Sequence, residues 1–242
     1  MPYRRLARTD DEIDDALRNG LEKADNTPPE EWAISQPTYE GAKAFYEMWK
    51  KERKEVGGAL KTQSDLSKQL AKDKAKVKKY LSHFIQSFNL AIDRGEIPAS
   101  DRALMGIDVS SDTLPPMGGV NDIVRVGNNL IDGEKKRIEA GGAAVAAPTI
   151  EQVKAVFEPF AETRKQQGTA AEAYDREQED VENMREEGKD WSKEMADEVE
   201  FHFRKDDPPS LRRKARLWGV VYVSRPGEPP EEGILHSEED EF

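Results

Sequence analysis

The chain has 242 residues and no cysteine, and its 49 Asp and Glu residues outnumber its 37 Lys and Arg residues, for a formal net charge of −12. The lack of cysteine excludes disulfides, thiolate nucleophiles and Cys-ligated zinc or iron–sulfur sites. No apolar run approaches the roughly 18 residues needed to cross a bilayer, and the start of the chain lacks the apolar region of a signal peptide. We therefore expect a cytoplasmic protein of one large or two small domains, whose acidic balance argues against nucleic acid as the main partner.

An internal duplication is the strongest pattern in the sequence. Residues 37–54 read PTYEGAKAFYEMWKKERK, and residues 148–165 read PTIEQVKAVFEPFAETRK, at an offset of 111. Other matched positions are the aromatic pairs Tyr46 with Phe157 and Trp49 with Phe160, the ends LMGI (104–107) and LWGV (217–220), and Asn19 with Asn129. The sequence predicts two tandem helical repeats, residues 1–112 and 113–225, followed by an acidic Pro-rich tail, residues 226–242.

Each repeat is predicted to be helical. Thr38 and Thr149 precede the periodic stretches and are suitable N-cap residues. Apolar residues then follow at spacings of three and four, which is typical of helices buried along one seam. In the first repeat these are Tyr46, Trp49, Val56, Leu60, Leu70, Val77, Leu81, Phe84 and Phe88, and in the second they include Ile150, Val153, Phe157, Phe160, Val181 and Met195. A shorter helix is expected around residues 123–138.

Two architectures fit this pattern. The glycines at 57–58 and Gly168 favour a turn, so that each repeat forms a helical hairpin within a compact bundle. The continuous heptad phase instead favours one very long helix in each repeat. Pro159 implies a kink or a helix start. We expect an all-α, tandem-duplicated antiparallel bundle with long coiled-coil-like helices, and of the two arrangements we prefer the compact bundle.

The apolar pieces at the repeat ends, residues 107–109 and 220–223, occupy equivalent positions. The second is a β-branched and aromatic run between Gly219 and Pro226, which is typical of a strand. We expect the two pieces to lie near a pseudo-twofold axis, where they could pair as a small two-stranded ribbon.

The sequence contains no motif for catalysis or for a cofactor. A GxSxG elbow and the Lys-Ser/Thr of a phosphate loop are both missing. Glu198 and His202 are one helical turn apart and could share a metal, but a second Glu-x-x-His pair is missing. We interpret His83 as a packed or boundary residue and assign no specific role to His236. The expectation is a protein without metal, cofactor or catalytic residues.

A dense basic cluster is the one candidate interaction site. It consists of Arg212, Arg213 and Arg216, followed by Trp218. The cluster could hold an anionic partner, with Trp218 stacked on a base. We favour pairing with nearby acids such as Glu198 and Glu200, or with the acidic tail. The lysines at 72–79 are interpreted as a solvated helix face.

The stretch from Lys72 to Val109 resembles a group of uncharacterised bacterial helical proteins. Those proteins have a basic helix followed by a Pro and a terminal DRxxMG[IL] motif. The residues that carry the resemblance are Lys72, Asp73, Ala75, Lys76, Pro98, Asp101, Arg102, Met105, Gly106 and Ile107. The resemblance implies an all-α bundle and no activity.

The sequence favours a non-enzymatic structural or assembly protein that acts through protein contacts and associates with itself. Incorporation into a particle or filament is compatible with this prediction. One alternative is a ligand-binding module that uses the groove between the repeats, with Trp49, Trp191 or Trp218. Another is an enzyme that uses carboxylates with His83 or His202.

Overall fold

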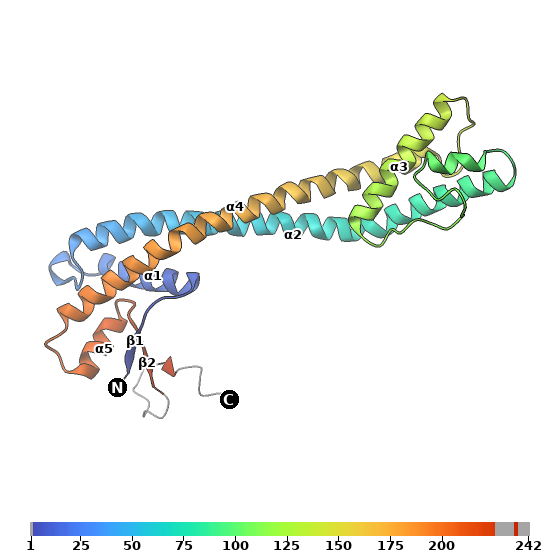
Figure 1. Ribbon diagram of the computed structural model, residues 1–242. Coiled ribbons are helices and arrows are strands. Elements are labelled where there is room, and N and C mark those ends of the chain that lie inside the picture. The colour runs from blue at the N-terminus through green and yellow to red at the C-terminus, as the bar shows by residue number, and fades with distance from the viewer. Residues whose placement is uncertain (1, 226–234, 237–242) are drawn as a thin grey trace. The chain divides into compact units, whose positions relative to one another are not determined.

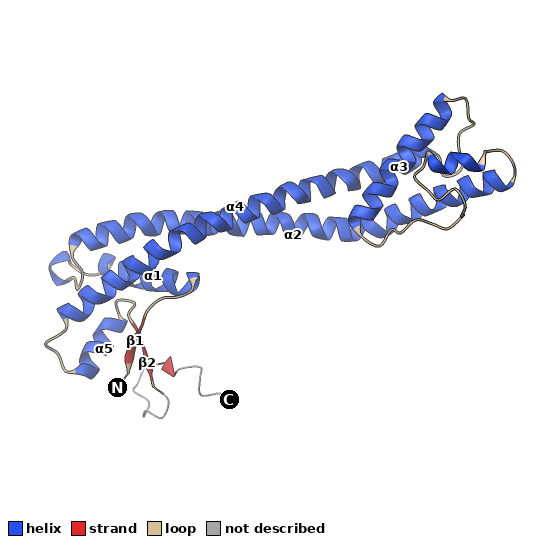
Figure 2. Ribbon diagram, viewed as in Figure 1, coloured by secondary structure: helices blue, strands red, loops and turns tan. Residues whose placement is uncertain are grey.

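The computed structural model describes residues 2–225 and the backbone of residues 235–236 (Figure 1). Helices dominate, which confirms the all-α class (Figure 2). The α-helices are α1 (Asp10–Asp25), α2 (Gln36–Asp93), α3 (Val120–Glu139), α4 (Ile150–His202) and α5 (Pro208–Arg216). Short 3-10 turns span Pro29–Glu31 and Ala99–Ala103, and the strands are β1 (Tyr3–Arg5), β2 (Val221–Ser224) and β3 (Leu235–His236).

The chain folds into two compact units, and both long helices contribute to each of them. The first unit comprises Met1–Gly57 and Asp175–Phe242, and the second comprises Gly58–Tyr174. These units cut across the predicted repeats, because each unit combines residues from 1–112 with residues from 113–225. The duplication itself stays a prediction.

The first unit is built around aromatic residues of α2. Phe45 and Trp49 are fully buried, with ring centroids 6.0 Å apart. They pack with Leu17 of α1, Val199 of α4 and Trp218, which follows α5. This core joins α1, the beginning of α2 and the end of α4 to the C-terminal elements.

The second unit is built from the end of α2, from α3 and from the beginning of α4. Its core includes Phe84 and Phe88 from α2, Leu130 from α3 and Phe157 from α4. Gly127 on α3 allows a close approach, because a Cβ there would lie 2.1 Å from Cε2 of Phe157. The apolar seam predicted from helical spacing thus supplies most of this interior.

The preference for helical hairpins is wrong, because α2 and α4 are continuous helices of 58 and 53 residues. α2 passes through Gly57 and Gly58 without turning, and α4 passes through both Pro159 and Gly168. Apart from the neighbouring backbone of α2 itself, no atom of the described residues lies within 4 Å of a Cβ placed at Gly57 or Gly58, so no packing constraint forces a break there. Leu60, predicted to be buried, is 47% exposed close to these glycines.

Capping residues fix the starts of the long helices. The Thr149 Oγ1 accepts the Gln152 N–H at 3.3 Å, while the Thr149 N–H donates to Gln152 Oε1 at 3.0 Å. The predicted cap at Thr149 is therefore correct, and α4 does not start at Pro159. The prediction for Thr38 is wrong, because α2 begins at Gln36 and Ser35 Oγ accepts the Thr38 N–H at 3.3 Å.

The two segments LMGI and LWGV adopt the same local backbone. The Gly106 N–H donates to the Ala103 carbonyl at 3.1 Å. In the same way, the Gly219 N–H donates to the Arg216 carbonyl at 3.1 Å. Gly106 has φ +65° and Gly219 has φ +84°, a left-handed conformation that glycine adopts without strain. A Cβ on Gly106 would lie 3.4 Å from Cβ of Asn129, and one on Gly219 would lie 3.3 Å from Cβ of Asn19.

The small sheet differs from the predicted ribbon. β2 pairs antiparallel with β1 and parallel with β3, so residues 220–223 do not pair with residues 107–109. Residues 107–109 lie in the second unit and lead into a turn, where Asp108 Oδ1 accepts the Ser110 N–H at 2.8 Å. The predicted strand at 220–223 is correct in type, but its partners are β1 at the start of the chain and β3, which follows it in the sequence.

Candidate interaction sites

Only one member of the predicted basic cluster, Arg213, belongs to the exposed residues. Arg212 is 7% exposed and Trp218 is 4% exposed, so the indole ring packs inside the first unit and has no free face for a base. Arg213 is exposed, and its Nη2 donates to Ser210 Oγ at 3.0 Å. Nη1 of Arg216 is buried without a hydrogen-bond partner among the described residues. The role of this cluster as an interaction site therefore remains a prediction.

The acids proposed as partners of this cluster have structural roles of their own. Glu198 accepts hydrogen bonds from the N–H of Ser35 at 2.5 Å and from Thr38 Oγ1 at 2.7 Å. It therefore fixes the start of α2. Glu200 accepts the Tyr222 hydroxyl at 2.6 Å and pairs with Arg4 at 3.1 Å, which ties α4 to the sheet.

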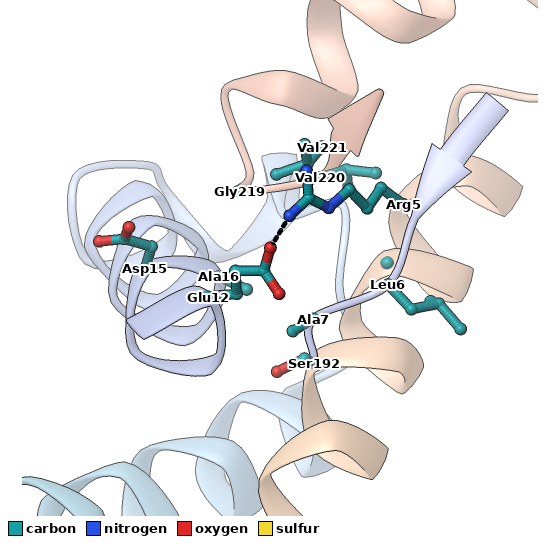
Figure 3. Close-up of a pocket in the computed structure, with 11 residues that line it drawn as sticks. Arg5, Leu6, Ala7, Glu12, Asp15, Ala16, Ser192, Gly219, Val220 and Val221 are labelled. Atoms are coloured by element: carbon teal, nitrogen blue, oxygen red, sulfur yellow. Dashed lines mark hydrogen bonds and ion pairs between the residues drawn. The ribbon is translucent and has the colours of Figure 1, made fainter. Parts of the chain in front are cut away.

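A cavity of about 210 Å³ lies in the first unit (Figure 3). It is bordered by α1, α4, the chain that follows β1 and the segment before β2. The Arg5 guanidinium and the Glu12 carboxylate form an ion pair at this cavity. Glu12 Oε2 also accepts the N–H groups of Arg8 and Thr9 at 2.7 and 3.1 Å.

The Arg5 and Glu12 side chains of this cavity are paired with each other, and this pairing determines whether Glu12 can act as a proton donor. Burial raises the pKa of Glu12, but the hydrogen bonds from Arg8 and Thr9 and the charge of Arg5 outweigh burial and lower it. A carboxylate with a lowered pKa is a poor proton donor near neutral pH. The Glu12 group is therefore a helix cap and an ion-pair partner rather than a general acid.

The histidines considered for metal binding do not converge on a site. His83 and His202 are exposed and belong to different units. Glu198, the proposed co-ligand of His202, already accepts hydrogen bonds from Ser35 and Thr38. The side chain of His236 lies outside the described residues.

Three carboxylates do come together in the first unit. Glu52 on α2 and Glu177 and Asp180 on α4 have oxygen atoms within 4.8 Å of one another. Lys51 Nζ donates to Glu52 at 3.1 Å, which offsets part of their charge. Sequence spacing missed this cluster, because its members come from two helices that are distant in the sequence.

A basic groove lies entirely within the second unit. Lys76, Lys79 and His83 occupy positions i, i+3 and i+7 of α2, and therefore share one helix face. They line an open groove of about 760 Å³ together with Leu90 and with Gln152 of α4. We call this surface the α2 groove.

The cationic side chains of the α2 groove lack counter-charges. Lys76 and Lys79 are exposed, and neither forms an ion pair or a hydrogen bond with another described residue. Two other lysines of the same helix do have partners, since Lys68 pairs with Asp65 at 3.4 Å and Lys74 donates to the Gly118 carbonyl at 2.5 Å. The groove thus presents positive charge that the described chain leaves unneutralised.

Charge is distributed unevenly between the two units. The first unit holds 34 Asp and Glu residues against 21 Lys and Arg residues, whereas the second holds 15 against 16. The whole acidic excess of the chain therefore belongs to the first unit, and the second unit has one more basic than acidic residue. The net charge of the sequence conceals this, because the first unit is assembled from two separate segments.

Comparisons with known proteins identify no relative. No protein-family model matches the chain, and neither the curated proteins nor the solved structures yield a significant match. The resemblance of residues 72–109 therefore rests on its quoted residues alone. None of the described helices combines the length and the apolar character needed to span a membrane.

Proposed function

We propose that this chain is a non-enzymatic structural or assembly protein that associates with copies of itself. One observation carries the proposal: an acidic unit and a unit with an unneutralised basic groove occur in the same chain. Opposite charge on two surfaces steers encounter between molecules and fixes their orientation. The chain therefore carries both halves of a complementary contact.

A contact of this kind is heterologous, because it joins two different surfaces of the same protein. Repetition of a heterologous contact generates a closed ring where the rotation closes, and an open filament where it does not. Incorporation into a particle or filament is compatible with either geometry.

The alternative of a tryptophan-lined ligand groove has less support. Trp49 and Trp218 are 0% and 4% exposed, so both rings are part of the core. Trp191 is partly exposed, and its ring packs against Gly41, where a Cβ would lie 2.3 Å from the indole. These tryptophans therefore have packing roles in the first unit.

Sedimentation velocity of the full chain tests the proposal. At about 50 mM salt, the mean mass should rise above the 27.3 kDa monomer as concentration increases from micromolar to several hundred micromolar. It should return toward the monomer at about 500 mM salt, because screening weakens contacts between exposed charges. A 27.3 kDa species at every concentration and salt would refute self-association.

A further inference from the structure

We propose that the α2 groove binds the acidic segment 237–242 of a second copy of this chain. The proposal rests on the self-association proposed above and names the contact that mediates it. Residues 237–242 read SEEDEF, so four consecutive acids precede Phe242. This is the densest acidic run in the sequence.

The groove places two exposed lysines on one face of α2, beside which an acidic segment could run. Lys76 and Lys79 lie one turn apart on α2, with His83 one further turn along the same face. Both lysines are exposed and unpaired among the described residues. An acidic segment placed here would gain charge-assisted hydrogen bonds without displacing an existing ion pair.

The dimensions of the groove and the segment agree. Lys76 and Leu90 are 14 residues apart on α2, which corresponds to about 21 Å at 1.5 Å per residue. Six residues of extended chain span at most about 21 Å. The acidic run can therefore follow the lysines while Phe242 reaches the far end of the groove.

The far end of the groove is apolar. Leu90 is 55% exposed and lines the groove beside Pro148. A phenyl ring covering Leu90 would remove apolar surface of both side chains from water. The order of the segment, acids followed by Phe242, thus matches the order of the groove, cations followed by Leu90.

The segment follows β3 in the sequence and belongs to the first unit. β3 pairs through its backbone with Val223 and Ser224 of β2, and residue 237 follows β3 directly. The occupant of the groove is an extension of the more acidic unit, as the proposed heterologous contact requires.

Peptide binding to the full chain provides the direct test. A fluorescein-labelled peptide of residues 235–242 should bind the full chain saturably at low salt, as measured by fluorescence anisotropy. Lys76→Glu with Lys79→Glu should weaken binding at least about tenfold, because two charge-assisted contacts become repulsive. Lys61→Glu with Lys78→Glu is the matched control, since both lysines are exposed on α2 outside the groove.

A charge exchange then tests the contact in the intact protein. Chains with Lys76→Glu and Lys79→Glu, or with Glu238→Lys and Glu239→Lys, should each lose association in sedimentation. A chain that carries all four substitutions should regain it, because the complementary charges are restored in reversed order. Restoration also shows that the variants fold.

Several outcomes would overturn this inference. Peptide binding that is equally weakened by the Lys61 and Lys78 substitutions would place the site elsewhere. Binding of the acidic segment to the groove that does not depend on protein concentration would mean that the segment binds its own chain. Tight displacement of the peptide by short duplex DNA would assign the groove to nucleic acid. Salt-dependent association that survives both pairs of substitutions would refute this contact and leave the proposed function standing.

Discussion

Arg137 and Glu134 form a two-point ion pair in the interior of the second unit, with Nε to Oε2 at 2.8 Å and Nη2 to Oε1 at 2.9 Å. Their side chains are 3% and 1% exposed. The pair also holds the chain that leaves α3, because Glu134 Oε1 accepts the Val145 N–H at 3.0 Å and Arg137 donates to the Ala143 carbonyl. Two buried charges thus link a helix to the loop that follows it.

Arg137→Leu is expected to lower the free energy of unfolding by about 3–5 kcal/mol, because it leaves the Glu134 carboxylate buried without its cation. Urea denaturation followed by circular dichroism measures the change. Arg125→Leu is the control: its exposed pair with Asp122 spans 3.7 Å and should contribute less than about 1 kcal/mol. Equal losses in the two variants would contradict the role assigned to the buried pair.

Gly57→Ala and Gly58→Ala are each expected to raise the free energy of unfolding by about 1 kcal/mol, because alanine has the higher helix propensity. Beyond the adjacent backbone of the helix, the described part of the chain has no atom within 4 Å of the new Cβ at either position. Gly127→Ala tests the opposite case, since its Cβ would collide with the Phe157 ring, and should destabilise the protein. Thermal denaturation distinguishes the expected gain in stability of Gly57→Ala and Gly58→Ala from the expected loss in Gly127→Ala. A loss of stability in Gly57→Ala would mean that a break in α2 is required there.

Glu12→Gln is expected to remove a pH-dependent contribution to stability. The pKa of Glu12 is lowered in the folded protein, because the hydrogen bonds and the Arg5 charge outweigh the effect of burial. Its contribution is therefore present above the unfolded pKa and is lost as pH falls through the lower folded pKa.

The Glu12→Gln variant should consequently lose about 1 kcal/mol at pH 7, the typical size of a capping interaction. The loss should become small near pH 3. Melting temperatures measured across this range provide the check, with the exposed Glu30→Gln as control. A loss that stays constant from pH 7 to pH 3 would show that the charge of Glu12 is not involved.

Local spacing is sufficient to predict the two long helical stretches, the helix around residues 123–138 and most of the core, but not α1 or α5. Trp49, Phe84 and Phe157 recur at helical intervals with their apolar neighbours, and all three are buried. Helical spacing of apolar residues indicates which face of a helix is buried. It does not indicate where the helix ends, so the glycines at 57–58 favour a turn that α2 does not make.

The α2 groove lay beyond prediction for a different reason. Its lysines are visible in the sequence as part of a basic helix, which usually indicates a solvated face. The lack of nearby acids and the apolar end at Leu90 become apparent only when α2 and the start of α4 are placed together. The pairing of β1 with β2 likewise joins segments more than 200 residues apart, a distance at which local patterns give no signal.

The division of the chain into units also determines the order in which they are completed during translation. The second unit is the uninterrupted stretch of residues 58–174, whereas the first unit needs residues 175–242 as well as residues 1–57. At about 5–20 residues per second, a ribosome makes the intervening stretch in roughly 6–23 seconds. During that interval Phe45 has been synthesised but lacks Gly188, against which it packs in the folded protein, so the core of the first unit cannot close until the end of α4 has been made.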